Sequence, residues 1–508
     1  MQLSLDPFIE GGFIDRWMRL VGLASPDTIK DHPLEVKVLG SAFLNTLTRV
    51  CSSTDPIKFG NMLLLMTGPR RSRKSWLTDF IEGLLGVLNG PYLIPHGTPE
   101  AVGEAIGKIK WGFVTANEAG EIVANATKEG YMSAWGFLMN KVYMLESIQM
   151  LRRQKRKSVF VPGKSYYVSL MLNALPEDIS LLFEKWRGLE RRFIPLYFTR
   201  APRRAWRRRV EGSDEFIDFI WLCKILRQTV FFIDIPEDPL NELGEELDRK
   251  DRNAPEDVKS LNDALWEYSI KLLMSWLVDV SVPKIAEELK NIVTRNCHHR
   301  NNTFKEKKGR IEPFGIQYDI ATVTDYGDNL PLKEDLFEEN KGGEPFVVHL
   351  SPLSPTCHQV LVTIHRIVTP LWGQMVTMVT NLSGFDPKIA GRISEFLNLL
   401  RERKVVTLRE AYRGPLKQVM RLREVGGVKN LWTKVLGPLE ATGQVVVRRL
   451  GRRRTFLIHP SARICGTCAL FHRPECPEES EDTLKAGGMM NVDDEACERW
   501  VPLWGDEG

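Results

Sequence analysis

Residues 61–85 read NMLLLMTGPRRSRKSWLTDFIEGLL, which is an apolar run, a basic loop and an amphipathic segment. This pattern predicts a buried strand, a loop and a helix. The loop from Gly68 to Ser75 follows the spacing GxxxxGK[ST], except that Arg73 stands where the second glycine is usual. In such loops backbone N–H groups at a helix N-terminus surround phosphates, while a lysine reaches the β and γ oxygens and a hydroxyl binds Mg²⁺. Lys74 and Ser75 are the candidates for these two roles.

Arg73 is the departure from this pattern. If the position requires a positive φ, an arginine there strains the loop by roughly 1 kcal/mol or more. Gly68, Arg73, Lys74 and Ser75 are therefore candidate nucleotide-binding residues, and the alternative is a basic loop in front of a helix.

The next strand also ends in polar residues. Between residues 57 and 200, short apolar runs alternate with amphipathic segments, which predicts an α/β fold with a mostly parallel sheet covered by helices. The run WGFVTA ends at Asn117-Glu118. An acid at the first position would hold Mg²⁺ through water and a glutamate at the second would polarise the attacking water. Asn117 is neutral and a weaker partner for Mg²⁺, whereas Glu118 can still act as a base; the alternative is that Asn117 caps a helix.

Two further features follow in a recognisable order. The run YYVSLMLNA carries Asn173 near its end, and Arg191-Arg192 precedes the run FIPLYF. This succession over about residues 57–200 resembles the AAA+ ATPase core of MCM-type helicases and of archaeal plasmid and virus replication helicases. The resemblance implies ATP and Mg²⁺ as cofactors, Asn173 as a sensor of the γ-phosphate between the two nucleotide-binding strands, and a homo-oligomer such as a hexameric ring. It also implies an arginine acting on a neighbour's nucleotide, for which Arg192 is the candidate and Arg191 the close rival; a basic surface turn is the alternative.

Charge is strongly segregated along the chain. The totals are 69 Lys+Arg and 65 Asp+Glu, a net charge of +4. Residues 151–210 hold 16 Lys+Arg against 4 Asp+Glu, and residues 401–460 hold 15 against 4. Two such blocks indicate a polyanionic partner such as a nucleic acid, and the alternative is a pair of solvated basic faces.

The first basic block contains LRRQKRKSVFVPGKSYY, which resembles the hairpin that ring helicases direct into their central channel. Its candidate phosphate contacts are Arg152, Arg153, Lys155, Arg156, Lys157 and Lys164. The string Gly163-Lys164-Ser165 within it lacks the upstream glycine and leads into a strand rather than a helix, so it is not a nucleotide loop.

The second block is predicted to be a winged helix. VKNLWTKVLGPLEATGQ reads as a helix ending at Gly443, and VVVRRLGRRRTFLIHP as a hairpin turning at Gly451. In such modules the helix enters the major groove and the wing contacts the DNA backbone; the alternative is a module for protein contacts. The candidate DNA contacts are Lys429, Lys434, Arg448, Arg449, Arg452, Arg453 and Arg454.

Four of the eight cysteines lie in the C-terminal tail. Cys465, Cys468, Cys476 and Cys497 have a spacing that would hold one Zn²⁺ tetrahedrally and give a short polar segment folding energy. An iron–sulfur cluster is the competing interpretation, with His472 able to replace one cysteine. Cys297-His298-His299 is left without a metal because no further ligands can be identified.

We expect six regions: an N-terminal helical segment (1–55), the AAA+ ATPase core (56–212), a helical lid or linker (213–298), a connecting region (299–350), a helical and winged-helix DNA-binding region (351–462) and a zinc-binding module (463–508). The N-terminus carries no basic segment followed by an apolar run, and no stretch approaches the ~18 apolar residues of a membrane span. A cytoplasmic protein without a membrane partner is expected.

The leading functional hypothesis is an ATP-hydrolysing, DNA-dependent helicase-like replication protein of a plasmid or virus. Its rival is a non-enzymatic DNA-binding replication initiator or regulator that keeps a degenerate ATPase as a scaffold, as Arg73 and Asn117 would allow. A nuclease or primase is disfavoured because no clustered acidic triad can be placed.

Overall fold

The computed structural model describes residues 10–458 with gaps, and the chain divides into two compact units, residues 1–372 and 373–508. The larger gaps are 118–131, 175–191, 199–207, 252–255, 299–306, 324–330, 333–344, 383–392 and 418–430, and shorter ones include 69–71, 94–97, 153–156, 441–444 and 451–453.

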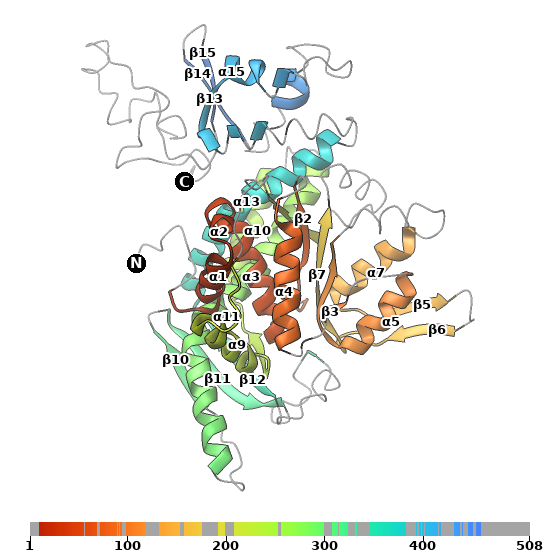
Figure 1. Ribbon diagram of the computed structural model, residues 1–508, viewed down its shortest axis with the longest axis vertical. Coiled ribbons are helices and arrows are strands. Elements are labelled where there is room, and N and C mark those ends of the chain that lie inside the picture. The colour runs from red at the N-terminus through yellow and green to blue at the C-terminus, as the bar shows by residue number, and fades with distance from the viewer. Residues whose placement is uncertain are drawn as a thin grey trace, which may run out of the picture. The chain divides into compact units, whose positions relative to one another are not determined.

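The first unit contains a five-stranded parallel sheet (Figure 1). In spatial order its strands are β3 (Tyr92–Leu93), β4 (Trp111–Ala116), β7 (Tyr167–Ala174), β2 (Leu63–Thr67) and β8 (Phe193–Tyr197). Every residue of β2, β4, β7 and β8 is buried, as expected of a parallel sheet with both faces covered. The predicted α/β class is confirmed for this region.

Three helices pack against this sheet: α4 (Lys74–Val87), α5 (Pro99–Ile109) and α7 (Met132–Met144). The buried residues Leu77, Ile81 and Leu84 recur every three to four positions and give α4 one apolar face. The predicted order of strand, loop and helix over 61–85 is therefore confirmed.

The N-terminal helices are α1 (Phe13–Ala24), α2 (Pro26–Asp31) and α3 (Pro33–Thr48), so the helical character expected of residues 1–55 is found over 13–48, while Cys51–Ser52 forms a short strand. Nearly all of α3 is buried, and it contacts β4 and β7 as well as β9 (Thr229–Ile233) of a second sheet. The indole N–H of Trp17 donates to the Val36 carbonyl at 2.9 Å and joins α1 to α3. Helix α3 is therefore part of the core shared by both sheets.

The second sheet corrects two expectations from the sequence. Its strands, in order, are β1 (Cys51–Ser52), β9 (Thr229–Ile233), β12 (Phe346–Ser351), β11 (Ile316–Thr322) and β10 (Lys307–Ile311). The helical lid or linker expected over 213–298 contains a strand, β9, and 299–350 holds strands where a connecting region was expected. Strand β9 pairs in parallel with β1 and β12, and no local pattern reveals partners so distant in sequence. Helices α9 (Asp214–Leu226) and α11 (Glu256–His298) are found as expected, and a further helix, α10 (Glu237–Asp251), lies between them.

An antiparallel hairpin precedes β7, as the sequence predicts. Strands β5 (Ile148–Arg152) and β6 (Lys157–Val161) pair over their full length. The turn at Gly163-Lys164-Ser165 leads directly into β7, which confirms that this string does not begin a helix.

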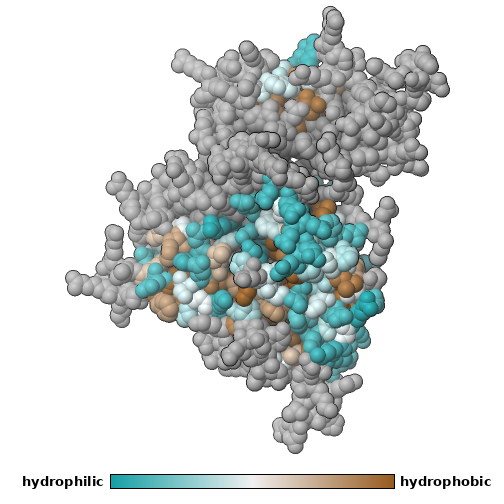
Figure 2. Space-filling model, turned by 180° about the vertical axis from the view of Figure 1, so that it is seen from behind, coloured by the Kyte–Doolittle hydropathy of each residue, from teal (hydrophilic) through white to brown (hydrophobic). Residues whose placement is uncertain are grey.

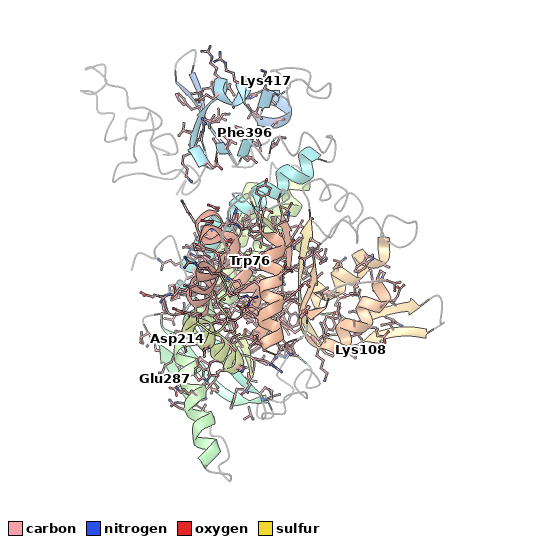
Figure 3. All side chains as sticks on the ribbon, in the orientation of Figure 1. Trp76, Lys108, Asp214, Glu287, Phe396 and Lys417 are labelled. Atoms are coloured by element: carbon pink, nitrogen blue, oxygen red, sulfur yellow. The ribbon has the colours of Figure 1, made fainter. Side chains whose placement is uncertain are left out.

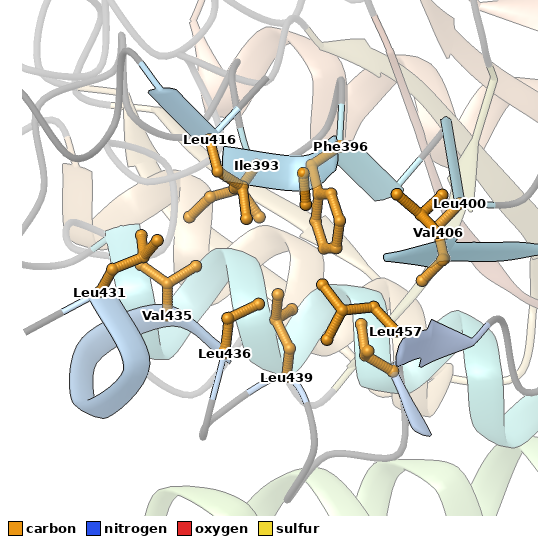
Figure 4. Close-up of a cluster of buried hydrophobic side chains, with 12 residues drawn as sticks. Ile393, Phe396, Leu400, Val406, Leu416, Leu431, Val435, Leu436, Leu439 and Leu457 are labelled. Atoms are coloured by element: carbon orange, nitrogen blue, oxygen red, sulfur yellow. The ribbon is translucent and has the colours of Figure 1, made fainter. Parts of the chain in front are cut away.

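The second unit has a small antiparallel sheet of β13 (Val405–Thr407), β15 (Arg454–Ile458) and β14 (Val446–Leu450), in that order. Helix α15 (Leu408–Arg413) begins with a capping box between Thr407 and Glu410, and a π-helical turn spans Trp432–Leu436. A helix α13 (Ser354–Leu382) crosses the boundary between the units. The predicted hairpin about Gly451 is confirmed. Figure 4 shows the apolar core of the second unit, in which Phe396, Leu436 and Leu457 are fully buried.

Within the described residues, none of the helices combines the length and the apolar character that crossing a membrane requires. Figure 2 shows hydrophilic and apolar residues intermixed on the described part of one face.

Candidate nucleotide-binding site

The candidate site lies where β2 ends. Gly68 has φ +145°, and a Cβ there would overlap the Phe198 carbonyl oxygen, so the loop leaves the sheet through a position that only glycine fits. The backbone N–H of Phe198 donates to the Thr67 carbonyl at 2.8 Å and holds the two chain segments together. The chain then enters α4 at Lys74, which places a helix N-terminus at the carboxyl end of the sheet.

Arg73 has φ +69°, the left-handed conformation that the glycine pattern implies. Its guanidinium donates to Thr28 Oγ1 at 3.1 Å and to Asp27 Oδ2 at 3.2 Å, and its side chain is 4% exposed. The arginine therefore tolerates the strained position while its side chain is anchored on α2. Its proposed contact with nucleotide stays a prediction.

Lys74 is buried at the first position of α4, and its ammonium donates to the Gly68 carbonyl. The positive charge of Lys74 therefore lies against the loop 68–75, which the sequence predicts to bind phosphate. Ser75 is exposed beside it on the first turn. Figure 3 labels Trp76, the next residue on α4, whose ring stacks on Phe80 with centroids 5.3 Å apart.

A chain of hydrogen bonds connects the ends of β7 and β4 with α4. The Asn173 amide group donates to Asn117 Oδ1 at 2.7 Å and to Thr78 Oγ1 at 3.0 Å. The Asn117 amide group donates in turn to Asp79 Oδ1 at 3.1 Å. Strand β7 lies between β2 and β4, so the expected position of Asn173 between the two candidate nucleotide strands is confirmed.

Thr78 and Asp79 were missed by the sequence interpretation. Asp79 follows Ser75 by four residues, a spacing that places both on one side of a helix, and this signal was available in the sequence. Their contacts with Asn173 and Asn117 depend on the arrangement of strands and could be seen only in the structure.

Of the remaining residues predicted to act on a nucleotide, Arg192 alone lies within the described part of the chain. Glu118 and Arg191 fall outside the described residues. Arg192 precedes β8, whose first residue Phe193 pairs with Leu63 at the start of β2. The Arg192 side chain is thus at the amino end of the sheet, opposite its own Lys74, with its guanidinium 5.8 Å from the Tyr143 ring centroid.

A second buried lysine lies at this amino end. Lys271 donates to the Asn61 carbonyl at 2.5 Å, and its ammonium is 4.1 Å from the Tyr143 ring centroid. Burial lowers the pKa of Lys271 to about 7, although the nearby Glu267 carboxylate acts in the opposite direction. Glu267 accepts hydrogen bonds from Lys58 at 3.0 Å and from Tyr143, and these groups keep its pKa below the usual range despite burial.

The candidate DNA contacts are only partly placed. Lys164 is exposed in the turn before β7, and the backbone puts Arg152 and Lys157 opposite each other at the end of the β5–β6 hairpin. Lys434 lies on the π-helical turn, Arg448 and Arg449 on β14 and Arg454 on β15. Outside the described residues are Arg153, Lys155, Arg156, Lys429, Arg452, Arg453 and the four tail cysteines.

Among the residues that the structure describes, no group of three or more His, Cys, Asp or Glu side chains is placed to hold a metal ion by itself. A comparison of the chain with protein-family models found no match, and a comparison with curated proteins found none either.

Proposed function

We propose that this protein is a DNA-dependent ATPase, a helicase-like replication protein of a plasmid or virus with an AAA+ core. The observation that carries the proposal is the convergence of Lys74, Asn117 and Asn173 at the carboxyl end of one parallel sheet. Ligands of open α/β sheets bind at this end of the strands, and a helix N-terminus with a lysine favours phosphate there.

In this proposal Lys74 binds the β and γ phosphates and Ser75 helps to hold Mg²⁺. The metal would neutralise charge that develops on the phosphates during hydrolysis. Asn173 contacts the γ-phosphate region and Glu118 orients and deprotonates the attacking water. A phosphate oxygen would replace the Gly68 carbonyl as the partner of Lys74, so binding exchanges one hydrogen bond for a stronger ionic one.

Arg192 is proposed to act on the nucleotide of a neighbouring subunit in a ring. Its position at the amino end of the sheet supports this role, because it lies at the opposite end from the phosphate loop of its own chain. The β5–β6 hairpin and the sheet of the second unit would bind DNA through their basic residues, largely through phosphate contacts. Cys465, Cys468, Cys476 and Cys497 are proposed to bind Zn²⁺, and the protein to act in the cytoplasm.

The test is ATP hydrolysis by the purified protein, measured with and without single-stranded and duplex DNA. Turnover that DNA stimulates and that Lys74→Ala and Glu118→Gln abolish is the expected result. Lys108→Ala, which changes an exposed lysine on α5 labelled in Figure 3, is the control and should turn over like the wild type.

The second candidate is a DNA-binding initiator with a non-hydrolysing ATPase scaffold. The neutral Asn117 and the anchoring of Arg73 on Asp27 favour it. Absence of turnover above the Lys74→Ala background, with DNA binding intact, would select this candidate and reject the motor.

A further inference from the structure

Asp79 places a carboxylate near the end of β4, where the strand is followed by an asparagine and not by an acid. It is exposed on the second turn of α4, four residues after the exposed Ser75. Side chains at this spacing share one helix face, with Cβ atoms about 5–6 Å apart. Residue 117, at the end of β4, carries an amide instead of an acid.

Asn117 links this carboxylate to the sheet. Its amide nitrogen donates to Asp79 Oδ1 at 3.1 Å, and its oxygen accepts from Asn173 at 2.7 Å. Because an amide has both a donor and an acceptor, Asn117 can bind a carboxylate on one side and Asn173 on the other. An aspartate at 117 would repel Asp79 instead, so the two positions are complementary as they stand.

Unpartnered polar atoms collect at the same end of the sheet. Asn173 is 3% exposed, and within the described residues its Oδ1 has no hydrogen-bond partner. Two further buried oxygens also have no hydrogen-bond partner there: Thr67 Oγ1, at the end of β2, and Ser72 Oγ, just before α4. A buried polar group without a partner costs about 1–3 kcal/mol, and although such atoms also occur elsewhere, as at Asn45 and Ser275, these three lie beside the N-terminus of α4, where a polar ligand could bind them.

We propose that Asp79 is the carboxylate that holds the nucleotide's Mg²⁺ in this protein, together with Ser75 and in place of an acid at residue 117. The inference rests on the proposed ATP site. Mg²⁺ favours one or two carboxylates and completes its shell with phosphate oxygens and water.

The experiment measures the dissociation constant of a fluorescent ATP analogue in Mg²⁺ and in EDTA, and Mn²⁺ binding to the nucleotide complex by electron paramagnetic resonance. The variants are Asp79→Asn, Asn117→Asp and the exchange Asp79→Asn/Asn117→Asp. Asp218→Asn, an exposed aspartate one turn after Asp214 of Figure 3 on α9, is the matched control.

Asp79→Asn should weaken metal-dependent nucleotide binding and Mn²⁺ affinity by about 10- to 100-fold, with binding in EDTA unchanged. The exchange variant should regain most of the loss, because it returns one carboxylate and one amide to the pair, and Asp218→Asn should match the wild type. Wild-type metal dependence in Asp79→Asn, together with Lys74-dependent nucleotide binding, overturns this inference and leaves the ATP site standing. Failure of the wild-type protein to bind the analogue in either buffer overturns both.

Discussion

Lys74 and Lys271 are both buried beside the same parallel sheet, one at each end. At the amino end, Lys271 is held by Asn61 and by the ring of Tyr143, and Glu267 lies close enough to affect its pKa. At the carboxyl end, Lys74 donates to the Gly68 carbonyl, while the oxygens of Thr67 and Asn173 nearby have no partner in the described residues. Lys271 therefore has a carbonyl partner and a neighbouring carboxylate, whereas Lys74 lies beside side-chain oxygens to which the described residues give no partner.

The largest expected effect separates the two lysines by function. Lys74→Ala should reduce ATP turnover by about 10²–10³-fold, because it removes the positive charge that stabilises the phosphates. The unfolding curve should change little. Lys271→Met should leave ATP turnover within a few-fold of the wild type. Equal losses of turnover in the two variants would contradict the functional distinction between the two ends of the sheet.

Gly68→Ala should destabilise the first unit by about 2–4 kcal/mol, since it places a Cβ against the Phe198 carbonyl at a φ that other residues avoid. Gly83→Ala is the matched control, because Gly83 is exposed on α4 with no atom within 4 Å of its added Cβ. That change should stabilise the protein by about 0.5–1 kcal/mol through helix propensity. Urea denaturation of both variants measures the difference. Equal changes in the free energy of unfolding would contradict the close contact between Gly68 and the Phe198 carbonyl.

The amino-end cluster predicts a pH dependence of stability. The pKa of Lys271 falls from 10.5 to about 7 on folding, so between these values the unfolded chain binds more protons. Stability should therefore rise with pH in this window, by about 2 kcal/mol from pH 7 to 9 for this group alone. Subtracting the profile of Lys271→Met from that of the wild type removes the contributions of other groups. Parallel profiles would show that Lys271 does not carry the effect.

The smallest effect concerns the strain at residue 73. Arg73→Gly and Arg73→Ala both remove the contacts with Asp27 and Thr28 and differ only by a Cβ at φ +69°. The glycine variant should be more stable than the alanine variant by about 1 kcal/mol, as measured by urea denaturation. Equal stabilities would mean that the loop relaxes once the guanidinium is gone.

The sequence predicted the parts of the site that are local. The apolar run before Gly68 and the periodic residues of α4 fix a strand, a loop and a helix, and the polar residue after an apolar run located Asn173. The partners of Arg73 and Asn117 were not predicted, because Asp27 and Asp79 meet them only after strands and helices have packed. Strand β9 was missed for the same reason, since the residues TVFFI continue an apolar helical pattern and their pairing partners lie at 51–52 and 346–351.

The pairing of β1 with β9 and of β9 with β12 also bears on how the chain acquires its structure during synthesis. Ser52 pairs with Ile233, and Ile233 pairs with Leu350, so this sheet has a high contact order. At ~5–20 residues per second, a ribosome needs roughly 15–60 s between making the first of these strands and the last. During that interval α3 lacks its contacts with β9, so part of its apolar surface is exposed on the nascent chain.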